Sequence, residues 1–135
     1  MICFAVYSTA HAINRAYAPL LKPLGLTYPQ YIALTVLWEQ DGLNVGELSK
    51  RLQMETNTLT PLLKRLEKLG HIVRKRGIKD ERKVFIHLTK SGRTVQEHAP
   101  HITSCLIEAA GMSGADLNQA IALLHRLNNN LSASA

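Results

Sequence analysis

Two stretches decide the fold: VGELSKRL at residues 45–52 and NTLTPLLKRLEKLGHIVRKRGIKDERKVFIHLTKSG at residues 57–92. Leucines in the first stretch, and in the second as far as Gly70, recur at three- and four-residue spacing, which predicts two short amphipathic helices. Beyond Gly70 the pattern changes to short alternation in residues 71–76 and 83–89, which predicts two strands joined by the charged turn GIKDER. Two short helices followed by a basic hairpin are typical of a winged helix-turn-helix.

Capping residues set the bounds of the two short helices. Asn44 caps the first, with Glu47 three residues later as its capping-box partner. We expect a break over residues 53–57 and a second helix that runs to Leu69. Pro61 places the start of that second helix close before it, because proline is tolerated in the first turn.

The N-terminal third predicts two longer helices. Residues 2–21 carry apolar side chains at helical spacing. Thr27 is a suitable N-cap for the next helix, and Pro29 fits its first turn. Asp41 and Gly42 close that helix.

The C-terminal third is also predicted to be helical. Thr89 begins a helix that we expect Pro100 to kink, and Ser113 caps the last helix. The apolar stripe of this last helix comprises Leu117, Ile121, Leu124, Leu127 and Leu131. A 135-residue monomer has few surfaces left to cover two terminal helices, which favours an intersubunit helical interface. The predicted fold class is mainly α with a small β-hairpin, a winged helix-turn-helix dimerised through its N- and C-terminal helices.

Composition excludes several classes of protein. The chain is 46% hydrophobic and 19% charged, so whole-chain disorder is not expected. The longest apolar stretch, residues 31–38, is too short to cross a membrane, and the N-terminus lacks the pattern of a secretory signal. Two cysteines make neither a disulfide framework nor a zinc site, and the six histidines are scattered. We therefore expect a cytoplasmic protein with no metal and no cofactor.

The positive charge is concentrated in one part of the chain. The whole chain has 16 Lys and Arg against 10 Asp and Glu, a net charge of +6. Residues 64–93 hold 11 basic and 3 acidic residues, a charge of +8, while the remainder holds 5 basic and 7 acidic, a charge of −2. A local basic patch on a small domain indicates a polyanion partner. From charge alone, a solvated lysine-rich surface is the alternative.

The second short helix and the hairpin supply residues suited to DNA. Short hydroxyl and amide groups at the start of the helix can bond to bases and phosphates, and an Arg on the hairpin can enter a minor groove. The predicted DNA-binding residues are Thr56, Asn57, Thr58, Thr60, Lys64, Arg65, Arg76, Lys79 and Arg82. Helix capping is the alternative role for the polar side chains of residues 56–60. Asp80 is expected to form an ion pair with Arg82 or to serve the turn.

The two stretches quoted above resemble the core of MarR-family transcriptional regulators, with Asp80-Glu81-Arg82 in the hairpin and LTKSG opening the next helix. Residues 2–39, ICFAVYSTAHAINRAYAPLLKPLGLTYPQYIALTVLWE, are similar to the organic-hydroperoxide-sensing (OhrR) branch. The resemblance implies a single domain over residues 1–135 that is a homodimer on palindromic double-stranded operator DNA. Residues 1–22 and 89–135 would form the dimerisation helices, and residues 27–88 the DNA-binding lobe.

The resemblance also implies a redox site. Cys3 matches the thiol that an organic hydroperoxide oxidises, and Tyr17 and Tyr28 match the tyrosines that bond to it from the partner subunit. Phenol donors and a helix N-terminus both favour a thiolate. Cys105 is the natural resolving thiol, since one branch of the family forms an intersubunit disulfide, but the other uses low-molecular-weight thiols. The implied function is a repressor that releases DNA when Cys3 is oxidised.

Two other functions stay open at this point. One is a MarR-type repressor released by a small aromatic ligand, with Cys3 structural. The other is a thiol peroxidase whose basic patch is incidental. The basic hairpin argues against the enzyme, because peroxide catalysis has no use for it.

Overall fold

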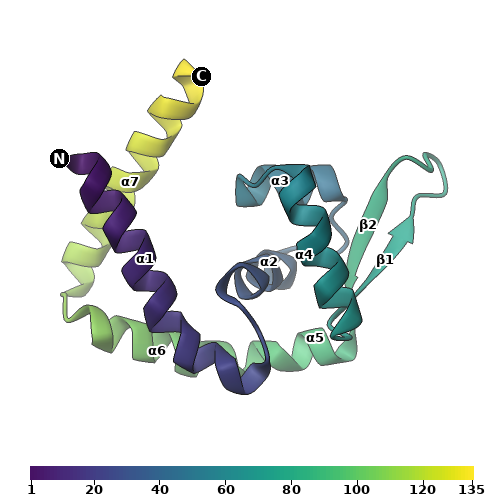
Figure 1. Ribbon diagram of the computed structural model, residues 1–135, viewed down its shortest axis with the longest axis horizontal. Helices are drawn as coiled ribbons and strands as arrows, with labels where there is room; N and C mark the ends of the chain where they lie inside the picture. The colour runs from purple at the N-terminus through teal and green to yellow at the C-terminus, as the bar shows by residue number, and fades with distance from the viewer. The chain divides into compact units, whose positions relative to one another are not determined.

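The computed structural model describes residues 1–135 and is mainly helical, with one two-stranded sheet (Figure 1). Contacts divide the chain into two compact units, residues 1–102 and residues 103–135, and each is described by itself. No helix combines the length and the apolar character that a membrane span requires. The expectation of a mainly helical fold with a small hairpin is confirmed.

The chain begins with two helices joined by a tight connection. Helix α1 (Ile2–Leu21) leads through the 3-10 turn η1 (Lys22–Leu24) to α2 (Tyr28–Glu39). Thr27 caps α2 through a reciprocal capping box with Gln30, in which the Thr27 N–H donates to Gln30 Oε1 at 2.9 Å. The expected cap at Thr27 is confirmed, and α2 ends at Glu39, just before the expected stop at Asp41 and Gly42.

The helix-turn-helix consists of α3 (Val45–Leu52) and α4 (Thr56–Lys68). Asn44 caps α3 as expected, accepting from the Glu47 N–H at 2.9 Å. The turn is shorter than expected, because α4 already begins at Thr56 and Pro61 therefore lies in its second turn.

The expectation that Pro61 sits in the first turn is thus wrong. The proline leaves the carbonyl of Asn57 without its usual intrahelical donor. Asn57 is exposed, so water can bond to that carbonyl, and the second turn tolerates the proline. At the other end, Gly70 follows the helix in the left-handed region (φ 86°), the conformation expected of a C′ glycine.

The hairpin pairs β1 (Ile72–Arg76) antiparallel to β2 (Val84–Leu88), with Ile72 opposite Leu88 and Arg76 opposite Val84. A bridge between Asn44 and Phe85 joins β2 to the start of α3. In Figure 1, α2 and α4 lie between α1 and the hairpin. The bridge joins β2 directly to the helix-turn-helix, and β1 is joined to it through its pairing with β2.

The core of the first unit is formed by side chains of α2, α3, α4 and the hairpin. Its most deeply buried side chains, each less than 2% exposed, include Leu34, Leu37, Leu48, Leu59, Leu63, Leu66, Ile72 and Ile86. Leucines of α4 thus pack on α2 and the strands within one chain.

The C-terminal helices follow the hairpin. Helix α5 (Lys90–Val95) is capped by Thr89, and a 3-10 turn η2 (Gln96–His98) separates it from α6 (Ala99–Ala110). The single kinked helix expected here is therefore interrupted, and Pro100 has no N–H to offer the Gln96 carbonyl. Helix α7 (Gly114–Ser134) is capped by Ser113, whose Oγ accepts from the Asp116 N–H at 3.1 Å.

Candidate functional site

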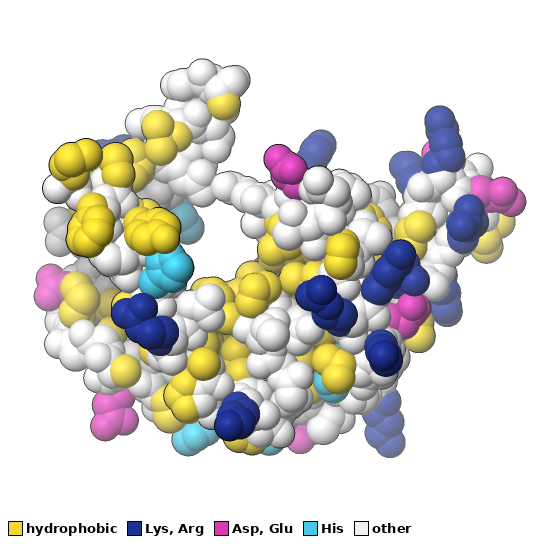
Figure 2. Space-filling view, viewed as in Figure 1, with side chains coloured by type: hydrophobic (Ala, Val, Ile, Leu, Met, Phe, Trp, Pro, Cys, Tyr) yellow, Lys and Arg dark blue, Asp and Glu magenta, His cyan; other side chains and the backbone are white.

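The outward face of α4 is polar and basic. Asn57 and Lys64, seven residues apart and so on the same side of the helix, are both exposed. Figure 2 shows Lys and Arg side chains over α4 and the hairpin, where the sequence concentrates the charge. This face has the chemistry to meet a polyanion.

A groove runs between α4 and the hairpin. It encloses about 450 Å³, and its lining includes Thr56 and Thr60 of α4 together with Arg74, Arg82 and Lys83 of the hairpin. The Thr60 hydroxyl donates to the Thr56 carbonyl at 2.9 Å. The groove therefore places three cationic side chains opposite the hydroxyl edge of the helix.

The hairpin turn holds Arg82 through Asp80. The Arg82 side chain lies 3.1 Å from Asp80 Oδ1 although it is 91% exposed, and the Arg82 backbone N–H donates to the same oxygen at 3.0 Å. These two hydrogen bonds lower the pKa of the Asp80 carboxyl. Gly77 permits the tight turn, since a Cβ there would lie 2.5 Å from the Asp80 carbonyl oxygen. Arg76 and Lys79 flank the turn and are exposed.

A second ion pair ties the hairpin to α4. Arg74 of β1 lies 3.1 Å from Glu67 of α4, and the Arg74 backbone N–H donates to the same carboxylate at 3.0 Å. The hydrogen bonds from Arg74 lower the pKa of Glu67. Because its side chain is only 29% exposed and its charge is paired, Arg74 is less available to an external anion than Arg82, whose side chain is 91% exposed.

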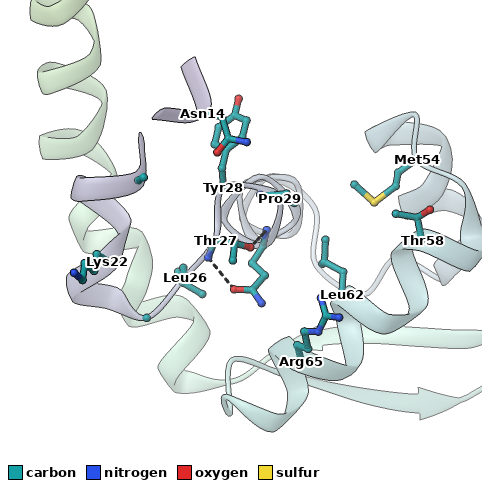
Figure 3. A pocket seen from close by; sticks show the side chains of 13 residues that line it. Asn14, Lys22, Leu26, Thr27, Tyr28, Pro29, Met54, Thr58, Leu62 and Arg65 are labelled. Atoms are coloured by element: carbon teal, nitrogen blue, oxygen red, sulfur yellow. Dashed lines mark hydrogen bonds between the residues drawn. The ribbon is translucent and has the colours of Figure 1, made fainter. Parts of the chain in front are cut away.

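Two of the expected DNA-binding residues do not line the groove beside the hairpin. Thr58 and Arg65, together with Leu62, line a cavity of about 830 Å³ between α4 and the α1–α2 connection. Figure 3 shows these side chains directed toward Tyr28 and its neighbours at the start of α2. The structure therefore divides the expected residues of α4 between the hairpin groove, the outward face and this cavity.

The two cysteines of the expected thiol site lie on different helices. Cys3 is exposed in the first turn of α1, and Cys105 is half-buried in α6. Tyr17 and Tyr28 come together, with ring centroids 4.5 Å apart. Burial raises the pKa of both phenols, and the neighbouring Tyr17 contributes to the rise at Tyr28. Both groups are thus protonated hydrogen-bond donors at neutral pH.

Sequence reasoning missed the anchors of α5. The Trp38 indole N–H donates to the Gly92 carbonyl at 2.9 Å, and Asp41 pairs with Arg93 at 2.8 Å. Asp41 also accepts from the Leu88 N–H at 2.9 Å. The Asp41-Gly42 pair signalled only the end of a helix, and nothing local signalled a contact with residues some 50 positions away. No group of three or more His, Cys, Asp or Glu is arranged to hold a metal ion.

Comparison with known proteins gives a consistent answer. The family model described as transcriptional regulator SarA/Rot matches residues 15–98. The HTH-type transcriptional regulator TtmR of Methylorubrum extorquens is 49% identical over 93% of this chain, which spans 63% of TtmR's length. The organic hydroperoxide resistance transcriptional regulator of Bacillus subtilis is 41% identical over 93% of this chain and 86% of its own length.

A solved structure is also similar over nearly the whole chain. Reduced AbfR bound to DNA, where AbfR is a protein of Staphylococcus epidermidis, has a TM-score of 0.85 and 32% identity. The match covers 98% of this chain and 91% of that one. The helices and hairpin described above are therefore shared with a protein solved in complex with DNA.

Proposed function

The chain belongs to the SarA/Rot and MarR-type family of transcriptional regulators, and on that premise we propose that it is a redox-sensing repressor. In this proposal a reduced homodimer binds operator DNA, and oxidation of Cys3 by an organic hydroperoxide releases it. The observation that carries the proposal is the joint presence of a basic helix-and-hairpin face and of the paired Tyr17 and Tyr28 rings.

The DNA-binding half of the proposal rests on the groove beside α4. With α4 in a major groove and the hairpin in the adjacent minor groove, one sugar-phosphate strand has to pass between them. The groove lined by Thr56, Arg82 and Lys83 lies in that position and has the matching charge. Asn57 and Lys64 would then face base edges, and Arg82, positioned by Asp80, would enter the minor groove.

The sensing half rests on the chemistry of the thiol. In the proposed dimer, the phenols of Tyr17 and Tyr28 from the partner subunit would donate hydrogen bonds to the Cys3 sulfur. The thiolate sulfur attacks one peroxide oxygen, the O–O bond breaks, and the leaving alkoxide takes up a proton as an alcohol. The cysteine becomes a sulfenic acid, which no longer accepts the two hydrogen bonds in the same way.

A second thiol completes the oxidation. Attack of a thiol sulfur on the sulfenic sulfur forms a disulfide and releases water. We assign this step to Cys105 of the partner subunit, with a low-molecular-weight thiol as the alternative. The disulfide then fixes the dimer in a geometry that does not match the operator.

The test is fluorescence anisotropy of the protein's own promoter DNA before and after one equivalent of cumene hydroperoxide. We expect oxidation to weaken binding at least about tenfold, and a thiol reductant to restore it. Cys3→Ser should bind DNA and ignore the peroxide, whereas Cys105→Ser should still be oxidised at Cys3. Peroxide-induced release in Cys3→Ser would contradict the assignment of the sensor.

The cavity in Figure 3 favours a second candidate function, release by a small aromatic ligand. Its volume of about 830 Å³ is in the range of ligand pockets, and Arg65 at its edge suits an anionic group. A ligand there would contact Thr58 and Arg65 of α4 directly. Ligand-driven release that persists in Cys3→Ser, with the mass of the protein unchanged, would favour this function over the redox switch.

A further inference from the structure

Four aromatic rings of α1 and α2 form a continuous series. Tyr28 contacts Tyr17 at a centroid distance of 4.5 Å, Tyr17 contacts Tyr31 at 5.8 Å, and Tyr31 meets Trp38 edge-on at 5.7 Å. These separations are those of interacting aromatic pairs. Tyr31, at the centre of the series, is only 3% exposed. Because Tyr31 is buried in a close-packed interior, displacement of the Tyr17 ring toward it would be passed on to Trp38.

The series ends on the backbone of α5. The Trp38 indole N–H donates to the Gly92 carbonyl across 54 positions of sequence. Gly92 also packs closely against the backbone of His71, since a Cβ there would lie 2.1 Å from the His71 carbonyl oxygen. The position of the Trp38 ring and the position of this turn of α5 are therefore coupled.

Helix α5 is the link between the DNA-binding lobe and the C-terminal helices. A second anchor holds the same turn, since Asp41 pairs with Arg93 and also accepts from the Leu88 N–H of β2. Without the Trp38 bond, α5 would stay attached to the lobe through Asp41 and through the contacts of Thr89 and Ser91 with Gly70 and His71. The Trp38 bond is thus one of several contacts that fix the orientation of α5 on the lobe.

We infer that Trp38 and Tyr31 are positioning residues that transmit oxidation at the thiol to α5 and hence to the DNA-reading helix. The inference rests on the proposed function, in which Tyr17 and Tyr28 bond to the thiolate. When the sulfur is oxidised, the Tyr17 ring shifts, Tyr31 follows, and Trp38 changes its bond to Gly92. The turn of α5 at Gly92 then moves relative to the lobe that carries α4.

Trp38 is the only tryptophan of the chain, so it reports on its own environment. We would record its fluorescence in the full-length protein before and after one equivalent of cumene hydroperoxide, without DNA. The emission maximum or intensity should change in the wild type and stay constant in Cys3→Ser. Unchanged emission in a wild type shown by mass to be oxidised at Cys3 would overturn the inference.

Operator binding by three variants tests the same inference independently. Tyr31→Phe keeps the ring and should respond to peroxide like the wild type, whereas Tyr31→Leu interrupts the series. Trp38→Phe keeps a ring but removes the N–H donor. In Tyr31→Leu and Trp38→Phe the ratio of oxidised to reduced dissociation constants should fall from at least about tenfold toward one. Trp38→Phe also serves if Tyr31→Leu does not fold.

The outcomes distinguish a failure of the aromatic series from a failure of the proposed redox switch. If the wild type releases DNA on oxidation and both variants release it equally, the aromatic series plays no part and the redox switch stands. If the wild type does not release DNA, the proposed switch fails, and the series has nothing to transmit. A reduced ratio in both variants, with Tyr31→Phe normal, supports the series.

Discussion

Helices α4 and α7 carry the same kind of leucine stripe but bury it to very different extents. In α4, Leu59, Leu62, Leu63 and Leu66 are between 0% and 7% exposed. In α7, Ile121, Leu124 and Leu131 are between 48% and 62% exposed. The spacing of apolar residues is equally regular in both helices, so spacing alone does not determine burial.

The difference teaches what an amphipathic pattern can predict. The pattern indicates that one face of a helix requires cover, but it does not say which surface supplies it. For α4 the cover comes from α2 and the hairpin of the same chain, and the lobe is complete. For α7 the apolar face has no such cover within its own unit, which agrees with the expected homodimer.

The largest effect on stability should come from substitutions in the buried leucine stripe of α4. Leu66→Ala removes a fully buried side chain from α4 and should lower the free energy of unfolding by about 2–5 kcal/mol. Leu69→Ala, at a position 46% exposed, is the matched control and should cost well under half as much. Urea unfolding at one fixed protein concentration measures both, since dimerisation shifts apparent stability. Equal losses in the two variants would mean that the cover of α4 is incomplete.

A substitution in the exposed stripe of α7 should change dimerisation. Leu124→Asp places an unpaired charge on the apolar face of α7 in each protomer and should raise the dimer dissociation constant at least about tenfold. Asn129→Asp adds the same charge on the opposite face of the helix and should leave the constant nearly unchanged. Sedimentation velocity over a range of concentrations distinguishes them. A normal dimer in Leu124→Asp would show that this stripe is not the interface.

The same contrast explains which parts of the fold were predictable. Helix starts at Thr27, Asn44, Thr89 and Ser113 follow from local capping chemistry, and the sequence contains all that is needed to place them. Pro61 misled the prediction, because a proline inside a helix costs less where water can replace the lost hydrogen bond. The exposed edge of α4 meets that condition.

Site residues were predictable only as residue types. The hydroxyl and basic side chains of α4 were identified as a set, but their division between the groove, with Thr56, and the cavity, with Thr58, depends on tertiary packing. The contact between Trp38 and Gly92 spans 54 positions and has no local signal. The expectation that Tyr17 and Tyr28 act at one thiol came from family resemblance and not from spacing, and the contact between their rings came from the structure.

A smaller effect is expected on the outer surface of the complete lobe, where side chains carry charge without supporting the core. Lys83→Ala should weaken operator binding and reduce the slope of log K against log salt concentration by about one. Lys90→Ala removes an exposed lysine outside the groove and is the matched control. Anisotropy titrations between 50 and 200 mM salt, about the range over which such slopes are resolved, provide the measurement. An unchanged slope in Lys83→Ala would remove the groove from the phosphate path.

The smallest effect is expected in the pH dependence of the free energy of unfolding. His71, half-buried where the hairpin begins, has its pKa lowered by burial, and its Nδ1 lies 2.9 Å from Ser91 Oγ. Because the folded-state pKa is below the unfolded value near 6.5, the contribution of neutral His71 to stability is complete above that pH. It is lost as the pH falls through the folded-state value. Unfolding free energies measured from pH 7.5 down to 5 should therefore fall more steeply in the wild type than in His71→Gln. Equal slopes in His71→Gln and in the wild type would contradict this prediction.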